Sequence, residues 1–382
     1  LAVLTHRLAR YELSRGRARA AGILCAAHPG LIVYTALVMT ETLSALALVL
    51  AGWLFARDRR DAPVRGAILF GLVLGLGVLV HPSFLAYAPA LVFLTGETFA
   101  RAADGSRRWA SLRKAIALGT VAIFCVFIPV LPWTLRNCRV MDRCTLVSTN
   151  GGWNLAIGSF SRATGRFETL RSSDGCAIVT GQVQQDACWR DLAIATIRSD
   201  VGRWVSLVPK KLGFTFDHES FQVEYLHEAD PDRWPEDRRQ LGRAFLTGAH
   251  RVWLTAAALG IAPIAWFARR GKAAPKGRIL IAGASIAALA LVAFAAWFSV
   301  ETPFYLLAVA ITLIGAWNVG TAGTVTRWAL FCLAGTIVTH AVFFGEDRYH
   351  IVIVPMLCFL AARAFCRHAE RTSNSPHPSE AM

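Results

Sequence analysis

Apolar runs of membrane-helix length recur along this chain, and short basic stretches separate many of them. A helix needs about 20 mostly apolar residues to cross the hydrocarbon core of a bilayer. The pattern predicts about ten complete transmembrane helices, at residues 20–39, 42–56, 66–80, 84–100, 115–135, 243–268, 279–298, 303–319, 328–344 and 349–366. We therefore expect an all-α polytopic membrane protein.

The basic residues predict how these helices are oriented. Loops 6–19, 57–65, 101–114 and 269–278 contain five, four, five and five Lys or Arg residues, whereas the turns on the other side contain one in total. Positively charged loops stay on the cytoplasmic side of a membrane. We therefore expect the other side to face outward, with the turns around Glu41, His81, Glu301 and Arg348 and the long segment 136–242.

Composition agrees with a membrane protein and excludes an ordinary soluble enzyme. Of the 382 residues, 55% are hydrophobic and 17% are charged, and the mean hydropathy is +0.45; soluble domains carry about 25% charged residues. The net charge is +15, but residues 136–242 contain 14 basic and 14 acidic side chains, so the whole excess lies in the apolar part. This distribution indicates membrane topology, and no nucleic-acid partner is expected.

The same pattern divides the chain into four parts. They are N-terminal transmembrane helices (1–135), an exoplasmic segment of small α/β or mixed structure (136–242), C-terminal transmembrane helices (243–366) and a cytoplasmic tail (367–382). The first five residues are apolar enough to end a membrane helix but too few to form one. We therefore expect a further helix and an outward loop upstream of Leu1.

Four of the nine cysteines fall in the segment expected to face outward. An even number of cysteines in an oxidising compartment is typical of disulfides. Of the three connectivities, we favour local pairing, Cys138 with Cys144 and Cys176 with Cys188. No pair has the CxxC spacing, so the sequence does not support zinc or another divalent metal, and no cofactor is predicted.

Two stretches of the outward segment have chemistry of interest. The string Asn150-Gly151-Gly152 signals a tight turn. Its backbone amides, with Asn154, can hold an anion or a sugar hydroxyl, or the string can form a hairpin turn with Trp153 packed below. Residues 204–212 have the pattern of an amphipathic interfacial helix, whose Lys210 and Lys211 either reach lipid phosphates or anchor the helix.

Several strings, in this order along the chain, carry a resemblance to a known family. They are Pro29 to Tyr34 with Thr40-Glu41-Thr42-Leu43, Gly71 to Gly77 with His81-Pro82, Pro132-Trp133 with Arg136-Asn137, Val147 to Gly158, Ala163-Thr164-Gly165, and Arg348-Tyr349-His350 with Pro355. Together they resemble bacterial members of the dolichyl-phosphate-mannose-protein mannosyltransferase group, glycosyltransferase family 39. His81 departs from the pattern, because the family usually has a basic residue before this proline.

The resemblance implies a GT-C fold in a bacterial inner membrane, with a catalytic cleft on the outer face. It implies an inverting transfer of a hexose or pentose from a polyprenyl-phosphate donor to a protein, lipid or glycan. The family's base is an acidic residue in the first outward loop, which falls before Leu1 in this numbering. No residue is therefore assigned as the base, and we expect the chain as given to be inactive.

The reaction predicts which residues carry it. A lipid-linked phosphate needs fixed cations at the headgroup level, for which Arg136 and Arg348 are the candidates. The alternative is that both arginines are snorkelling anchors. Glu41 is the candidate for an auxiliary acidic residue; the alternative is that it is a solvated residue at the start of a helix. Glu301, Glu346 and Asp347 are competing candidates for the same role. The remaining substrate-binding candidates lie on the outward side: His81, Asn137, Asn150, Gly151, Gly152, Asn154, Tyr349 and His350.

Two other functions remain open at this stage. A transporter or flippase would move a lipid-linked substrate without bond chemistry, and it would be expected to carry ionisable residues near mid-membrane and internal repeats. The sequence has neither an obvious repeat nor such a distribution, because its acidic residues gather at one rim. The other alternative is a polytopic scaffold without catalytic activity. His28 and His340, inside predicted helices, are expected to be satisfied by neighbouring helices.

Overall fold

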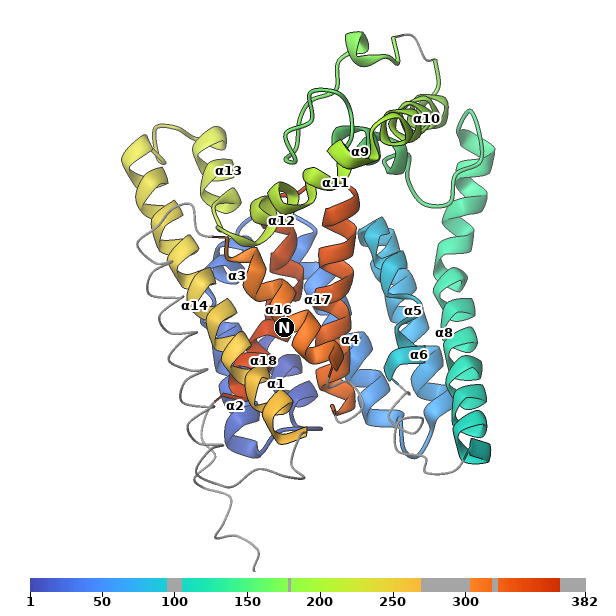
Figure 1. Cartoon of the computed structure of the whole chain (residues 1–382), viewed down its shortest axis with the longest axis vertical. Coiled ribbons are helices and arrows are strands. Elements are labelled where there is room, and N and C mark those ends of the chain that lie inside the picture. The colour runs from blue at the N-terminus through green and yellow to red at the C-terminus, as the bar shows by residue number, and fades with distance from the viewer. Residues whose placement is uncertain (95–104, 178–179, 269–302, 318–321, 365–382) are drawn as a thin grey trace, which may run out of the picture.

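The computed structural model describes residues 1–94, 105–177, 180–268, 303–317 and 322–364, and the regular elements in these ranges are helices (Figure 1). No β-strand occurs among them, and an isolated bridge joins Arg166 to Gly345. The described part of the segment 136–242 is therefore helical, which corrects the α/β or mixed structure expected from its turn signals. Local turn residues such as Asn-Gly-Gly do not reveal whether a helix begins at the turn.

The described residues up to Val140 form helices that run along the bundle or cap its ends. Their bounds are α1 Ala2–Ala9, α2 Arg15–Ala26, α3 Pro29–Tyr34, α4 Glu41–Asp58, α5 Pro63–Val80, η1 Pro82–Tyr87, α6 Ala90–Leu94 and α8 Gly105–Val140. Helix α5 packs between α4 and α8. Carbons added at Gly71 and Gly75 would lie 2.3 Å from the carbonyl oxygens of Ala122 and Val126, respectively. The two glycines therefore let the backbones of α5 and α8 approach closely, as small residues do in membrane helix pairs.

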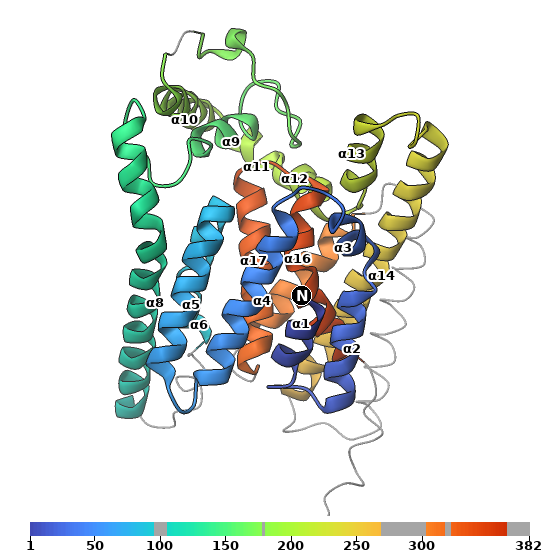
Figure 2. The same ribbon diagram turned by 180° about the vertical axis from the view of Figure 1, so that it is seen from behind.

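Shorter helices follow at one end of the bundle, the upper end in Figures 1 and 2. They are α9 Gly151–Ile157, η2 Ser172–Asp174, α10 Gln182–Ser199, α11 Val201–Ser206, α12 Val208–Phe216 and α13 Phe221–Ala229. Cys138 is bonded to Cys144 at the end of α8, and Cys176 to Cys188 between the η2 loop and α10. Both bonds therefore lie at this same end.

The C-terminal helices complete the bundle. They are α14 Glu236–Ala268, α16 Tyr305–Trp317, α17 Thr324–Val342, η3 Asp347–Ile353 and α18 Val354–Ala362. Helix α14 packs on α16 and α18, while α17 lies in the centre (Figure 2). Trp328 of α17 is buried and donates from Nε1 to the carbonyl oxygen of Leu48 at 3.0 Å. Its ring packs edge-to-face against Phe70. These contacts join α17 to α4 and α5.

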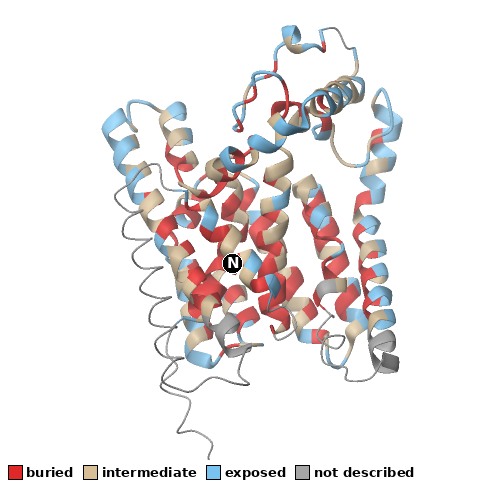
Figure 3. Cartoon of the chain, in the orientation of Figure 1, coloured by how far each residue is buried: buried red, intermediate tan, exposed pale blue. Residues whose placement is uncertain are grey.

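Three of the described helical stretches are long and apolar enough to cross a membrane: Pro63–Val80, Leu112–Val140 and Thr324–Val342. The outer face of α8 exposes apolar side chains, with Phe124 at 71% and Leu131 at 55% exposure, while buried residues fill the bundle interior (Figure 3). An exposed apolar face on a long helix fits contact with lipid tails. The protein is therefore a helical membrane protein.

The prediction of about ten uninterrupted spans needs correction where a proline lies at the start of a new helix. The span expected at 20–39 breaks at Pro29 into α2 and α3, and the described part of the span expected at 84–100, up to Leu94, is divided between η1 and α6. The apolar run at 349–366 contains η3 and then α18, with Pro355 at the start of the latter. Proline lacks an N–H and starts helices more readily than it continues them. The span expected at 279–298 lies outside the described residues.

Asp217 lies between α12 and α13 and caps the start of α16. Its Oδ1 accepts from the backbone N–H of Tyr305 at 2.7 Å. Burial raises the pKa of Asp217 to about 7, although the hydrogen bond from Tyr305 and the charge of Arg251 oppose this rise. The folded protein therefore holds the Asp217 proton more tightly than the unfolded chain does.

This shift predicts how stability depends on pH. A carboxyl with a raised pKa stabilises the fold when protonated, and that contribution is lost as pH rises through the folded-state pKa. We expect the Tm in detergent to fall between about pH 4 and about pH 7, with a loss on the order of a few kcal/mol. Asp217→Asn should remove most of this dependence, whereas Asp232→Asn, at an exposed position, should keep it. An unchanged slope in Asp217→Asn would contradict the assignment.

Candidate functional site

A cleft with mostly polar lining residues lies between α4, η1, α17 and η3. These elements come from opposite ends of the sequence. The cleft lining consists of Glu41, Ser44, His81, Ser83, Phe84, Tyr87, Thr336, Thr339, His340, Tyr349 and Val352. Three of the residues proposed from sequence, Glu41, His81 and Tyr349, therefore line one cleft.

The local structure explains how each of these side chains reaches the cleft. Glu41 is the first residue of α4, where the positive end of the helix dipole favours a carboxylate. His81 ends α5 in an extended conformation because Pro82 starts η1, and its Nδ1 lies 2.7 Å from Ser83 Oγ. Tyr349 lies in the first turn of η3 and stacks on His340, with ring centroids 4.3 Å apart.

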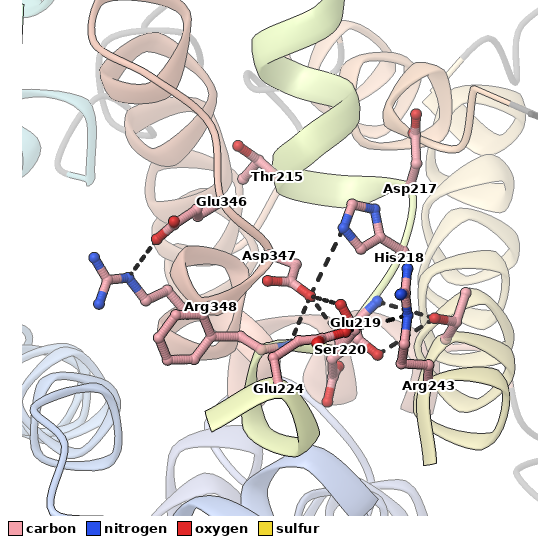
Figure 4. Close-up of polar contacts among 12 residues, drawn as sticks. Thr215, Asp217, His218, Glu219, Ser220, Glu224, Arg243, Glu346, Asp347 and Arg348 are labelled. Carbon is pink, nitrogen blue, oxygen red and sulfur yellow. Dashed lines mark hydrogen bonds and ion pairs between the residues drawn. The ribbon is translucent and has the colours of Figure 1, made fainter. Parts of the chain in front are cut away.

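Arg348 lies at the start of η3 and is held by an acidic and two aromatic side chains. Its Nε is 2.8 Å from Glu346 Oε2, the ion pair drawn in Figure 4, and its Nη2 donates to Tyr349 Oη at 3.1 Å. The guanidinium carbon lies 4.9 Å from the ring centroids of both Phe221 and Tyr349. The side chain keeps 26% of its surface exposed. The contacts fix the arginine without enclosing it.

The charge of Arg348 acts on the cleft residues. Burial raises the pKa of Glu41, and Arg348 is among the groups that oppose this rise. Burial lowers the pKa of His81, and Arg348 lowers it further. Neutral His81 is therefore favoured at neutral pH, while the Glu41 carboxyl titrates closer to neutrality than an exposed glutamate does.

The cleft also contains polar atoms that the described part of the chain leaves without hydrogen bonds. Glu41 is 5% exposed, and its Oε2 has no hydrogen-bond partner there; Ser44 Oγ, one turn further along α4, has none either. Buried polar groups are normally hydrogen-bonded. A polar ligand in the cleft would satisfy both atoms.

The second arginine and its neighbour lie elsewhere. Arg136 is exposed near the end of α8, with its guanidinium 5.0 Å from the ring centroid of Trp133. Asn137 is buried and donates from Nδ2 to the carbonyl oxygen of Val147 at 3.2 Å, so it anchors the following loop. Helix α8 packs on α5 and α6. Neither residue belongs to the cleft lining.

The two lysines of α12 differ in environment. Lys210 is exposed, whereas Lys211 is fully buried and donates from Nζ to the carbonyl oxygens of Ala341 and Val342 at 3.3 and 3.1 Å. These carbonyls end α17, where a cation is favourable. Lys211 therefore caps a helix instead of reaching lipid phosphates. Amphipathic spacing alone cannot distinguish a lysine that caps a helix from one that reaches lipid phosphates.

The Asn-Gly-Gly string starts helix α9 and forms neither the anion-binding turn nor the hairpin considered from sequence. Asp186 on α10 accepts from the Trp153 backbone N–H at 2.9 Å. A carbon at Gly152 would lie 2.0 Å from the Asp186 carbonyl oxygen, so this glycine lets α9 approach α10. Asn150 precedes α9 and Asn154 lies within it. Of the other acidic candidates, Glu301 lies outside the described residues.

Asp347 and His350 point away from the cleft. Asp347 Oδ2 accepts from the Ser220 backbone N–H, from Ser220 Oγ at 3.0 Å and from the Phe221 backbone N–H at 3.0 Å, so it caps the start of α13 (Figure 4). His350 is fully buried, with its Nε2 3.0 Å from Glu219 Oε2.

Sequence reasoning missed the buried group to which His350 belongs. Glu219 Oε2 lies 3.8 Å from His250 Nδ1 and 3.9 Å from His28 Nε2. Ligand atoms of Glu219, His250 and His350 all lie within 4.8 Å of one another, as in a metal-binding group. The three residues have no recognisable spacing in sequence, so no local signal could have revealed them. His28 and His340 were expected to bond to neighbouring helices, but their Nδ1 atoms are paired locally, with the backbone of Leu31 and Phe344.

Comparison with known proteins supports one family. Residues 1–133 match the family model described as dolichyl-phosphate-mannose-protein mannosyltransferase. No curated protein and no solved structure matches the chain. The matched residues include Glu41 and His81 of the cleft, and the match confirms the resemblance predicted from the sequence over this part of the chain. Through these residues the chain is similar to the dolichyl-phosphate-mannose-protein mannosyltransferases.

Proposed function

We propose that the protein transfers a hexose or pentose from a polyprenyl-phosphate donor to an acceptor at the outer face of a bacterial inner membrane, with inversion at the sugar. The observation that carries the proposal is the cleft in which Glu41 and His81 lie within the electrostatic reach of Arg348. Segment 136–242 is then the exoplasmic part. It covers the end of the bundle that carries α9 to α13 and approaches the acceptor.

Arg348 is suited to the donor phosphate. Breaking the glycosidic bond leaves negative charge on the phosphate oxygens, and a fixed cation stabilises that charge as it grows. Glu346 and the rings of Phe221 and Tyr349 hold the guanidinium in place. A guanidinium presents several N–H donors in a planar fork that matches phosphate oxygens. Arg348 therefore binds the leaving group without having to reorganise during the reaction.

Glu41 is suited to a substrate hydroxyl. Its Oε2 faces no hydrogen-bond donor among the described residues, and burial raises its pKa toward neutrality. A carboxylate of this kind accepts a hydrogen bond from a sugar or acceptor hydroxyl and orients it. His81, neutral and paired with Ser83, offers its other ring nitrogen to the same substrate.

Cleavage of a labelled donor tests the function. Membranes containing the protein as its gene encodes it receive polyprenyl phosphates that carry radiolabelled mannose, glucose or a pentose, and both free polyprenyl phosphate and labelled product are measured. We expect Glu41→Gln to lower kcat by at least about tenfold. Glu228→Gln, at an exposed position of α13, is the matched control and should retain the wild-type rate.

The competing function gives a different result in the same membranes. A transporter would move the intact labelled donor between leaflets and leave the sugar–phosphate bond unbroken. Transbilayer movement without cleavage for every donor sugar would overturn the proposal in favour of transport. Cleavage that is equally fast in wild type and Glu41→Gln would retain the reaction class and remove the role of Glu41.

A further inference from the structure

The buried group behind the cleft joins three separate elements. Glu219 lies in the loop between α12 and α13, beside Asp347 (Figure 4), while His250 lies on α14 and His350 on η3. The side chains of His250 and His350 have no exposed surface, and Glu219 is 1% exposed. A carboxylate and two imidazoles therefore share a site without solvent access.

Two consecutive carbonyl groups at the end of α12 fix the tautomers of both histidines. His350 Nδ1 lies 2.7 Å from the Thr215 carbonyl oxygen, and His250 Nε2 lies 2.8 Å from the Phe216 carbonyl oxygen. A carbonyl oxygen only accepts hydrogen bonds, so both of these nitrogens carry hydrogen. In the neutral rings, His350 Nε2 and His250 Nδ1 are therefore left with bare lone pairs.

The carboxylate adds a third electron-pair donor at the same point. Glu219 Oε1 accepts from Gln222 Nε2 at 2.8 Å, which leaves Oε2 for the histidines. A carbon added at Gly30 would lie 1.7 Å from Oε1, so the glycine makes room for this carboxylate. Oε2 lies 3.0 Å from His350 Nε2 and 3.8 Å from His250 Nδ1. Three lone pairs converge, and this arrangement is unfavourable unless a cation lies between them.

A proton and a metal ion differ in how well they satisfy this group. A proton on His350 Nε2 would pair it with Glu219 Oε2, but His250 Nδ1 would stay buried without a hydrogen-bond partner among the described residues. A metal ion uses all three lone pairs at once. His28 completes the surroundings. Its Nδ1 accepts from the Leu31 backbone N–H at 3.4 Å, so its hydrogen lies on Nε2, on the side of Glu219.

We propose that Glu219, His250 and His350 bind a Zn²⁺ ion, with His28 as an outer hydrogen-bond donor to the carboxylate. Two imidazoles and one carboxylate suit zinc, whereas calcium and magnesium prefer oxygen ligands alone. Ligand atoms about 2.0 Å from a tetrahedral ion are about 3.3 Å apart. The separations of 3.0 and 3.8 Å lie on either side of that value.

The proposed zinc is structural and acts on the cleft through η3. It joins the loop after α12, helix α14 and η3, which are otherwise held by hydrogen bonds and packing. His350 lies two residues after Arg348, so the ion fixes the register of the arginine. The assignment of the ion itself does not depend on the proposed transfer reaction.

Metal analysis of the purified protein tests the site. The protein, produced without a polyhistidine tag, is equilibrated with Zn²⁺ in detergent, desalted and analysed by mass spectrometry for metal content. We expect about one Zn²⁺ per chain, and loss of this ion in His250→Ala and in Glu219→Gln. His227→Ala, which removes a histidine of α13 paired with the Trp234 carbonyl oxygen, is the control and should retain the ion.

A spectroscopic measurement on wild type alone covers the case in which the variants fail to fold. X-ray absorption at the zinc edge should show nitrogen and oxygen ligands at about 2.0–2.2 Å and no sulfur. Wild-type protein that retains no zinc after desalting would overturn the proposal in favour of a protonated His350. Zinc retained equally by folded His250→Ala and Glu219→Gln would overturn it as well. Neither readout uses transfer activity, so failure of the metal site is distinguishable from failure of the proposed function.

Discussion

Replacing Arg348 by glutamine is expected to weaken the binding of a polyprenyl phosphate by roughly 100-fold, which corresponds to about 2.7 kcal/mol. Glutamine keeps much of the side-chain length but removes the positive charge and the planar set of donors. It also leaves Glu346 without the cation that lies 2.8 Å away, which adds negative charge near the phosphate. Equilibrium binding of a fluorescent polyprenyl phosphate to the detergent-solubilised protein measures the effect.

The chain offers two controls for this measurement. Arg136→Gln removes an exposed arginine from α8, and we expect it to change affinity by less than about threefold. Arg348→Lys keeps the charge but loses the fork geometry, so its affinity should lie between those of wild type and Arg348→Gln. Unchanged affinity in Arg348→Gln would remove this residue from the phosphate site.

Gly345→Ala is expected to destabilise the protein by about 3 kcal/mol or more. A carbon at Gly345 would lie 1.8 Å from the Lys211 carbonyl oxygen and 2.9 Å from Thr215 Oγ1, both on α12. The first of these is a helical backbone atom, which cannot move without shifting α12. Gly345 also precedes Glu346 and η3, so relief of the clash would displace Arg348. Thermal unfolding in detergent measures the first effect, and binding of polyprenyl phosphate measures the second.

Gly151→Ala is the matched control for this substitution. Gly151 is the first residue of α9, and a carbon added there meets no atom within 4 Å. The same chemical change should therefore leave the Tm nearly unaltered. A Gly345→Ala protein with the wild-type Tm would show that α12 and the loop before η3 separate easily, which would weaken the case for a rigidly held Arg348.

The sequence placed three of the cleft residues on one side of the membrane, but it also proposed Arg136, Asn137, Asp347 and His350, which do not line the cleft. Glu41, His81 and Tyr349 lie at turns on the side with few basic residues, and the charge of the loops determines that side for every helix at once. It also located the family resemblance over the part of the chain that the family model matches. These predictions depend on composition and order along the chain, which survive errors of several residues in helix bounds.

Other features could not be predicted because they depend on contacts between distant residues. Lys211 reaches the last carbonyls of α17, and Asp347 reaches the start of α13, more than 100 residues away in each case. Helix breaks within apolar runs were missed because hydropathy averages over a proline at the bend. The group of Glu219, His250 and His350 was also missed because its members are distant in the sequence and meet only when three elements pack together.

Three consecutive residues of η3 serve two different environments. Tyr349 lines the cleft and Arg348 is paired with Glu346, whereas His350 contacts the carbonyl oxygen of Thr215 at the end of α12. A single extra residue in this tripeptide would rotate the following side chains by about a third of a turn of a 3-10 helix. The histidine would then turn away from α12 and Glu219. Length is therefore as constrained here as side-chain identity, and insertion variants would report on both environments together.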